Sequence, residues 1–195
     1  MTPTLALRRI LTCLTSSALL APTAQAQQSA LQWVPMREAG FNAPNVKPTA
    51  TEQEHALLQR IWSRELAGAR EMAPGTQYPS AVLIGTVDTT GAQLVFSIYA
   101  RAGYEKCQPA ENGATVEYSH WVCPLRVVRT EAGKPVVRDL PGYCMLWGDD
   151  PDAPREKNRV EYAYDAKTAT VRFRTLEHGR VLPQCSRTLR IQGQP

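Results

Sequence analysis

Residues 160–175 read VEYAYDAKTATVRFRT, and this stretch predicts its own local fold. Apolar and polar residues alternate on both sides of a central turn sequence, which is typical of two half-buried antiparallel strands. Folding the stretch about its central AKTA sets Tyr162 opposite Phe173 on one face and Glu161 opposite Arg174 on the other. One face of the hairpin is therefore apolar and the other carries a complementary charged pair, which fixes the register.

Further antiparallel pairs are predicted earlier in the chain, where apolar runs alternate with turn sequences. The predicted pairs are 81–87 with 93–99, a strand ending near Cys107 with 115–122 around Asn112-Gly113, and 125–129 with 136–140 around the turn at Gly133. In the first pair, Leu83 is expected opposite Phe96. A last strand is expected over residues 181–191, with a break or bulge at Pro183, which has no N–H to donate.

The segment that begins at Thr51 is predicted to be helical. Thr51 and Glu54 have the spacing of a capping box, and Leu58, Trp62 and Leu66 recur at helical spacing. The expected fold is therefore α+β, with one amphipathic helix packed on a curved antiparallel sheet of six to eight meander strands. A small closed β-barrel is the alternative.

The first 26 residues have the three parts of an export signal. Arg8 and Arg9 precede an apolar run over residues 10–20, and a small-residue site ends at Ala26. We expect cleavage near Ala26 and a periplasmic or secreted location. Cys13 lies inside the apolar run, ahead of that site, so lipidation there is the less favoured alternative. The mature chain is expected to have an extended N-terminal arm (27–50) and a single disulfide-stabilised domain (51–195).

Composition limits the classes of partner. No segment after the leader approaches the ~20 apolar residues that a membrane helix needs, so no transmembrane segment is expected. Removing Arg8 and Arg9 lowers the formal net charge from +4 to +2, and the remaining arginines form no long run, which argues against nucleic acid. We expect no cofactor, and the oligomeric state is left open.

The cysteines of the mature chain predict two disulfides. Four remain after the leader, namely Cys107, Cys123, Cys144 and Cys185. An even number in an exported chain is typical of disulfides, and the paired C-x-x-C spacing of a zinc site is missing from the sequence. A turn at Gly133 and Lys134 would place Cys123 opposite Cys144 and would leave Cys107 for Cys185. All three connectivities remain open at this stage.

For two groups of residues, a functional site is the alternative to a structural role. Asp149, Asp150 and Asp152 in GYCMLWGDDPDAP (142–154) offer oxygen ligands for a cation, but adjacent acids diverge and a compact ligand loop needs alternating positions. We expect a polar turn there and no metal site. His120 and Glu117 are the candidates for the acid and base of a small secreted hydrolase, although the sequence has no nucleophile elbow and no H-E-x-x-H pair.

A binding surface is the preferred prediction. Arginine, tyrosine and tryptophan dominate protein interfaces, and the candidate binding residues are Arg172, Arg174, Trp121, Tyr104 and Tyr99. The expected function is an exported non-enzymatic binding module of the cell envelope, which presents a rigid surface to a protein or cell-wall partner as an inhibitor, immunity or assembly-accessory protein. The secreted hydrolase is the main alternative. A carrier with an apolar cavity between helix and sheet is a further one.

Overall fold

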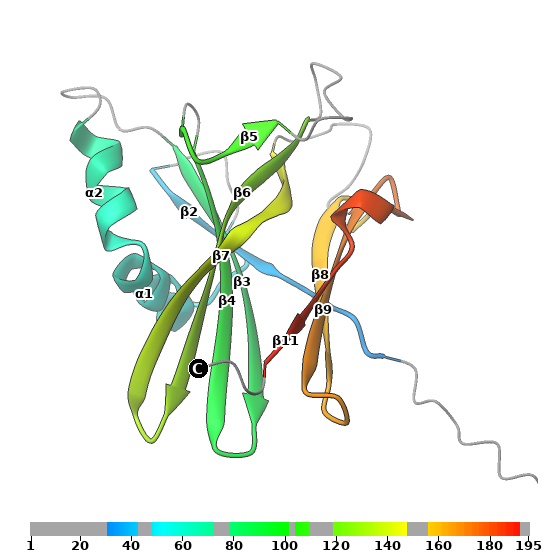
Figure 1. The fold of residues 1–195 in the computed structure, drawn as a ribbon. Helices are drawn as coiled ribbons and strands as arrows, with labels where there is room; N and C mark the ends of the chain where they lie inside the picture. Colours follow the sequence, from blue (N-terminus) through cyan, green and yellow to red (C-terminus); the bar gives the residue numbers. More distant parts are fainter. Residues whose placement is uncertain are drawn as a thin grey trace, which may run out of the picture. The chain divides into compact units, whose positions relative to one another are not determined.

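The computed structural model describes residues 31–42, 48–71, 79–101, 104–109, 119–147 and 156–191. These residues form two antiparallel sheets and two short α-helices (Figure 1). Sheet A contains β1 (Val34–Pro35), β8 (Arg159–Asp165), β9 (Thr170–Glu177), β10 (Arg180–Val181) and β11 (Arg187–Arg190). Sheet B contains β2 (Arg37–Phe41), β3 (Ser80–Thr89), β4 (Ala92–Arg101), β5 (Gln108–Pro109), β6 (Ser119–Glu131) and β7 (Lys134–Trp147).

The register predicted for the VEYAYDAKTATVRFRT hairpin is confirmed. In the β8–β9 pair, Tyr162 lies opposite Phe173 and Glu161 lies opposite Arg174. Tyr162 and Phe173 are buried, which identifies the aromatic face as the core side of sheet A. The alternation of the sequence was sufficient for this result because a shift of one residue would exchange the two faces.

The predicted single meander sheet is wrong, since the strands divide between two sheets. Both sheets are open within the described residues, so the closed-barrel alternative is wrong as well. The orders are β1-β8-β9-β10 in sheet A, with β11 on β9, and β2-β3-β4-β6-β5 in sheet B, with β7 on β6. Sequence alternation identifies which face of a hairpin is buried, but an apolar face is buried equally well by joining a sheet edge or by packing on another sheet.

The two sheets are joined by a shared apolar cluster. Phe96 of sheet B meets Phe173 of sheet A edge to face, with ring centroids 5.4 Å apart, and Tyr143 lies 5.3 Å from the same ring. Tyr162 of sheet A donates a hydrogen bond to the Thr86 carbonyl oxygen of sheet B at 2.8 Å. Gly85 allows this approach, because a Cβ there would lie 2.7 Å from the Tyr162 ring.

The segment predicted as an N-terminal arm supplies strands to both sheets. Val34 pairs with Tyr162 in sheet A, and residues 37–41 pair with β3 in sheet B. Between them, the backbone N–H of Met36 donates to the Val160 carbonyl oxygen at 2.9 Å. The chain therefore crosses from one sheet to the other within a few residues.

The predicted helix is present as two shorter ones, α1 (Glu52–Ile61) and α2 (Ser63–Glu71). The capping box of Thr51 and Glu54 is confirmed. Trp62 ends α1; its indole N–H donates to Ser97 Oγ at 3.0 Å and its ring stacks on Tyr99. The carrier alternative required an apolar cavity between helix and sheet, but Leu58 and Trp62 are buried in a cluster with sheet B and Leu66 packs against it, so the carrier is wrong. No helix in the described ranges combines the length and apolar character that a bilayer crossing requires.

Arg126 of β6 connects the helices to sheet B by polar contacts. Its guanidinium donates to the Ile61 carbonyl oxygen at 2.6 Å, to Glu65 at 3.0 Å and to Asp139 at 2.5 Å. It also lies 4.1 Å from the centre of the Trp62 ring. The pKa of Asp139 is lowered, chiefly by its hydrogen bond with Arg126. A single side chain thus satisfies the last carbonyl of α1 and two carboxylates.

Two other predicted pairings are present with shifted registers. Leu83 lies opposite Ile98, not Phe96, because the β3–β4 turn contains only Thr90 and Gly91. The shift is two residues, so the predicted faces are unchanged. Residues 108–109 pair with 121–122, so the second pairing is present but beyond the predicted strand end near Cys107, and the turn at Asn112-Gly113 lies outside the described residues.

Two disulfides are confirmed, but the favoured pairing is wrong. The bonds are Cys107–Cys123 and Cys144–Cys185. The β6–β7 turn consists of Ala132 and Gly133, one residue earlier than predicted, and a bulge follows near Pro124. Cys123 therefore lies opposite Tyr143 and not opposite Cys144. Neighbouring strand positions point to opposite faces, so Cys123 and Cys144 cannot meet across this pair.

Candidate functional site

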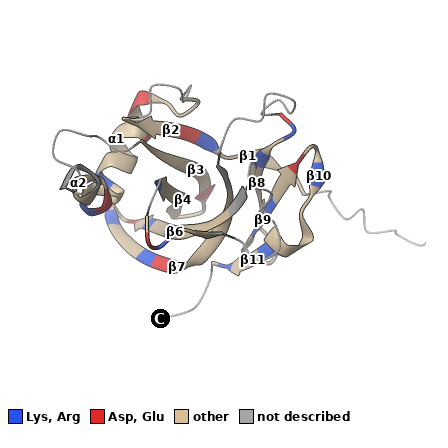
Figure 2. Ribbon diagram, turned by 90° about the horizontal axis from the view of Figure 1, so that it is seen from above, with Lys and Arg blue, Asp and Glu red and all other residues tan. Residues whose placement is uncertain are grey.

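The two arginines predicted to bind a partner lie on the outer face of sheet A. Arg172 and Arg174 alternate with the core residues Val171 and Phe173 along β9, so their side chains point away from the core. Arg172 is exposed and Arg174 is partly exposed. Figure 2 marks basic positions along β9 and the neighbouring β11. The outward orientation of both arginines is as expected, and their role in binding a partner stays a prediction.

Arg174 is held in place by two neighbours. Its guanidinium donates to Glu161 at 2.6 Å and lies 4.1 Å from the centre of the Trp33 ring. Arg159 donates to the same carboxylate at 2.7 Å. The Glu161 side chain is only 3% exposed, so its charge is compensated by two arginines and not by water. The result is a fixed cationic and aromatic platform with little side-chain freedom to lose on binding.

Two further residues, Arg190 and Val181, complete this outer surface. Thr188 lies opposite Arg172 in the β9–β11 pair, which places Arg190 on the same face of β11. Val181 lies opposite Leu176 and adds an apolar side chain that is 43% exposed. We call this set the arginine face, made up of Trp33, Arg159, Arg172, Arg174, Val181 and Arg190.

The charge of the chain is unevenly distributed around this face. Residues 156–191 hold eight Lys and Arg against four Asp and Glu, a net charge of +4. The rest of the mature chain, residues 27–155 and 192–195, holds twelve against fourteen, a net charge of −2. The small net charge of the mature chain, which argued against nucleic acid as a partner, therefore conceals a basic segment. An acidic surface would be attracted to this side of the molecule.

The predicted aromatic binding residues do not belong to the arginine face. Tyr99 is fully buried, stacks on Trp62 and shares a hydrogen bond with Ser80 at 3.1 Å, so its assignment to a binding surface is wrong. Tyr104 and Trp121 are partly buried against the core cluster shared by the two sheets. Tyr104 meets Tyr99 edge to face at 5.3 Å. These aromatics support the fold of sheet B.

The catalytic and metal candidates lie largely outside the described residues. Glu117 and residues 149–152 lie outside the described residues. His120 is described only as a backbone position of β6 opposite Leu146. The hydrolase alternative therefore stays a prediction. Among the side chains that the structure describes, no group of three or more His, Cys, Asp and Glu residues is arranged to hold a metal ion.

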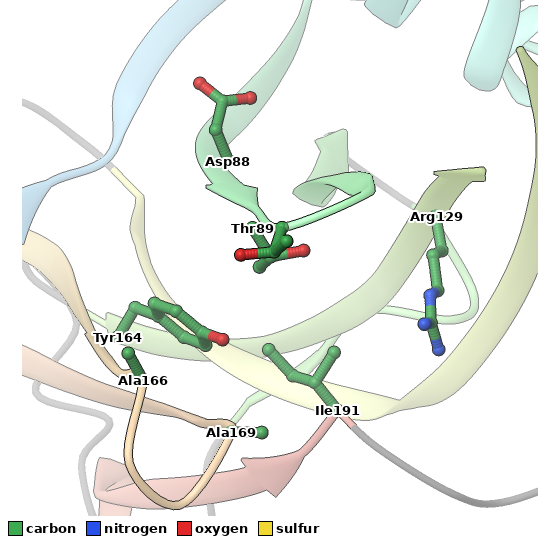
Figure 3. A pocket seen from close by; sticks show the side chains of 8 residues that line it. Asp88, Thr89, Arg129, Tyr164, Ala166, Ala169 and Ile191 are labelled. Atoms are coloured by element: carbon green, nitrogen blue, oxygen red, sulfur yellow. The ribbon is translucent and has the colours of Figure 1, made fainter. Parts of the chain in front are cut away.

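A small cavity of about 280 Å³ lies near the turns of β3–β4 and β8–β9 (Figure 3). It is lined by Asp88, Thr89, Thr90, Arg129, Tyr164, Ala166, Ala169 and Ile191. Asp88 already accepts a hydrogen bond from Gln93 at 3.0 Å. The volume is just below the roughly 300–1,000 Å³ of most ligand pockets. None of the residues predicted from the sequence to form a site is among those that line it.

Burial raises the pKa of three tyrosines, and this predicts a loss of stability at alkaline pH. Burial is the first cause for Tyr104 and Tyr143, whose pKa values rise to about 12, and it also raises the pKa of Tyr99. Folding favours the protonated phenol, so the stabilisation is complete below the ordinary pKa of about 10 and is lost as the pH rises towards 12.

The ultraviolet absorbance of tyrosinate measures this effect. We expect Tyr99, Tyr104 and Tyr143 to ionise late, together with unfolding, and all tyrosines to ionise near pH 10 in denaturant. Complete ionisation near pH 10 with an intact circular dichroism spectrum would contradict the burial of these rings.

The candidate site rests on geometry and charge. The arginine face combines a fixed platform at Trp33 and Arg174 with exposed cations at Arg172 and Arg190. No family model, curated protein or solved structure matches the chain.

Proposed function

We propose that this protein is an exported, non-enzymatic binding module of the cell envelope that presents the arginine face to an acidic surface of a partner protein. The predicted leader of residues 1–26 would direct the chain to the periplasm or beyond, and two disulfides are typical of such an oxidising compartment. In this proposal the disulfides and the shared core fix the scaffold, and sheet A carries the recognition surface.

The arrangement around Glu161 is the observation that carries the proposal. The Glu161 carboxylate is buried on an outward face and accepts hydrogen bonds from Arg159 and Arg174. The Trp33 ring lies against Arg174. This arrangement gives a binding surface of fixed geometry. Arg172 lies two residues from Arg174 on β9, Arg190 lies on the neighbouring strand β11, and both are exposed. The pKa of Asp165 is lowered, mainly by hydrogen bonds from Thr168 and Lys167, and the charge of Arg172 adds the smallest contribution. Rigid aromatic and arginine side chains are typical of the energetic centre of protein interfaces.

Co-purification from the native host tests the proposal. The full-length chain with a C-terminal tag is compared with the double variant Arg172→Glu/Arg190→Glu, and bound material is identified by mass spectrometry. We expect a stoichiometric protein with an acidic surface, recovered at least about ten-fold less well with the double variant, since arginines at an interface centre commonly contribute that much. Both arginines are exposed, so the melting temperature should change little.

A matched control separates the surface from the total charge. Arg60→Glu/Arg64→Glu on the helices makes the same change in net charge at exposed positions away from sheet A. The partner should be retained by this control. Equal losses with both double variants, or a loss with the helix variant alone, would contradict the arginine face as the binding surface. Recovery of a cell-wall glycan instead of a protein would contradict the proposed class of partner.

A further inference from the structure

Strand β7 leaves one of its edges open. It pairs with β6 over residues 134–140 and 143–147, and no strand in the described part of the chain pairs with its other edge. Arg187 donates to the Pro141 carbonyl oxygen at 2.7 Å and so satisfies one outward group of this strand. The open section therefore runs from Pro135 to Asp139, in a part of sheet B distant in sequence from the arginine face.

The turn of the hairpin determines which backbone groups face outward. Ala132 and Gly133 have φ values of 47° and 76°, as in the two-residue turns that close on a hydrogen-bonded pair, which is Glu131 with Lys134. Hydrogen-bonded pairs then alternate along the ladder, so Val137 and Asp139 direct their N–H and C=O groups away from β6. Pro135 also faces outward but has no N–H to donate.

Two exposed valines lie on this open edge. Val136 is 64% exposed and Val137 is 56% exposed, which makes them the most exposed large hydrophobic residues in the described ranges. Successive strand residues point to opposite faces, so one added strand would cover both valines with its own alternating side chains. Backbone bonding at an edge together with apolar side chains on both faces is the arrangement used in strand addition.

Charge indicates what kind of strand fits. Lys134 and Arg138 are exposed and make no ion pair with any residue that the structure describes, whereas Asp139 is bonded to Arg126. A second copy that paired Val137 with Asp139 would place the two Arg138 residues directly opposite each other, which is destabilising. An acidic segment would meet Arg138 and Lys134 with opposite charge.

We propose that the β7 edge binds an extended acidic segment of a partner protein as an added strand, through the backbone of Val137 and Asp139. This interaction is separate from the arginine face and does not depend on it. The site is short because Pro135 and Pro141 bound it. It therefore selects a segment of a few residues with alternating apolar and acidic side chains.

Nuclear magnetic resonance of the ¹⁵N-labelled mature chain provides the test. The probe is a blocked peptide of alternating glutamate and valine, and its matched control has lysine in place of glutamate. We expect saturable shifts centred on the amides of Val137 and Asp139, and binding of the lysine peptide at least about ten-fold weaker. Val137→Pro removes an outward N–H without breaking the β6 ladder and should weaken binding about five-fold or more.

A charge exchange keeps the test independent of the stability of the variants. Arg138→Glu should reverse the preference, so that the lysine peptide binds better than the glutamate peptide. Three results would overturn the proposal. The first is the absence of any saturable shift with the glutamate peptide. The second is a set of shifts confined to the arginine face near Thr188. The third is a concentration-dependent shift at Val137 without peptide, which would identify a second copy as the occupant. Each of these is distinguishable from failure of the arginine face, which is tested with Arg172 and Arg190.

Discussion

Replacing Phe173 with alanine is expected to lower the free energy of unfolding by about 3–5 kcal/mol, the usual cost of truncating a buried phenylalanine. Phe173 is 1% exposed and its ring lies between Phe96 and Tyr143, so the truncated side chain leaves a cavity between the two sheets. Urea denaturation followed by circular dichroism measures the change. Because the ring joins sheet A to sheet B, its loss should destabilise both sheets together in one transition.

The neighbouring residue provides the control. Arg172 is on the same strand, one residue away, but on the outer face and exposed. Arg172→Ala is expected to change the free energy of unfolding by no more than about 0.5 kcal/mol. Similar costs for the two variants would show that the faces of β9 are wrongly assigned. The arginine face would then lose its structural basis.

Removing the Cys144–Cys185 disulfide is the second change with a large expected effect. This bond closes a loop with a sequence separation of 41, so loop-closure entropy predicts a loss of about 4 kcal/mol when both cysteines are replaced by alanine. It also links β7 of sheet B to a short 3-10 helix, η1 (Pro183–Cys185). This helix precedes β11 of sheet A. Tyr143 reinforces the junction by donating a hydrogen bond to the Cys185 carbonyl oxygen.

The other disulfide is the matched comparison. Cys107–Cys123 closes a separation of 16 and links the residue before β5 to β6 of the same sheet, so its removal is expected to cost about 3 kcal/mol. Both double variants can be compared with the wild type by chemical denaturation. A larger loss for the Cys107–Cys123 variant would contradict the account of Cys144–Cys185 as the covalent link between the sheets.

Local pairing could be predicted from the sequence because it depends on parity and turn length. The β8–β9 register followed from alternation alone, since any odd shift would have buried Glu161 and Arg174 in the core. The β6–β7 turn was displaced by one residue, because Ala132 adopts a positive φ that sequence preference assigns to glycine or asparagine. A bulge near Pro124 shifts the register of the β6–β7 pair a second time. The predicted pairing of Cys123 with Cys144 failed for these two reasons.

The division into two sheets could not be predicted in the same way. It depends on contacts between residues far apart in sequence, such as Tyr162 over Gly85 and Phe173 against Phe96. Each hairpin alone presents one apolar face. Whether such a face is covered by a neighbouring strand or by a second sheet is decided by tertiary packing.

The candidate site could likewise be predicted only where it depends on alternation within one hairpin. Arg172 and Arg174 were identified because their parity is opposite to that of Phe173. Trp33 and Arg190 were missed, since only the pairing of β1 and β11 with the β8–β9 hairpin brings them to this face. Tyr99 was wrongly placed at a surface because its strand, β4, buries residues on both faces, against sheet A and against Trp62.

Site-specific photo-crosslinking in the native host tests the central proposal, a partner on the arginine face, most directly. Benzoylphenylalanine is introduced at Thr188, which is exposed beside Arg172, and in a second strain at Gln59 of α1, which is exposed away from sheet A. We predict a discrete adduct with one protein from the Thr188 position and none from Gln59. An adduct from Gln59 alone, or none from Thr188 under conditions where the chain is exported and folded, would contradict the arginine face as the binding surface.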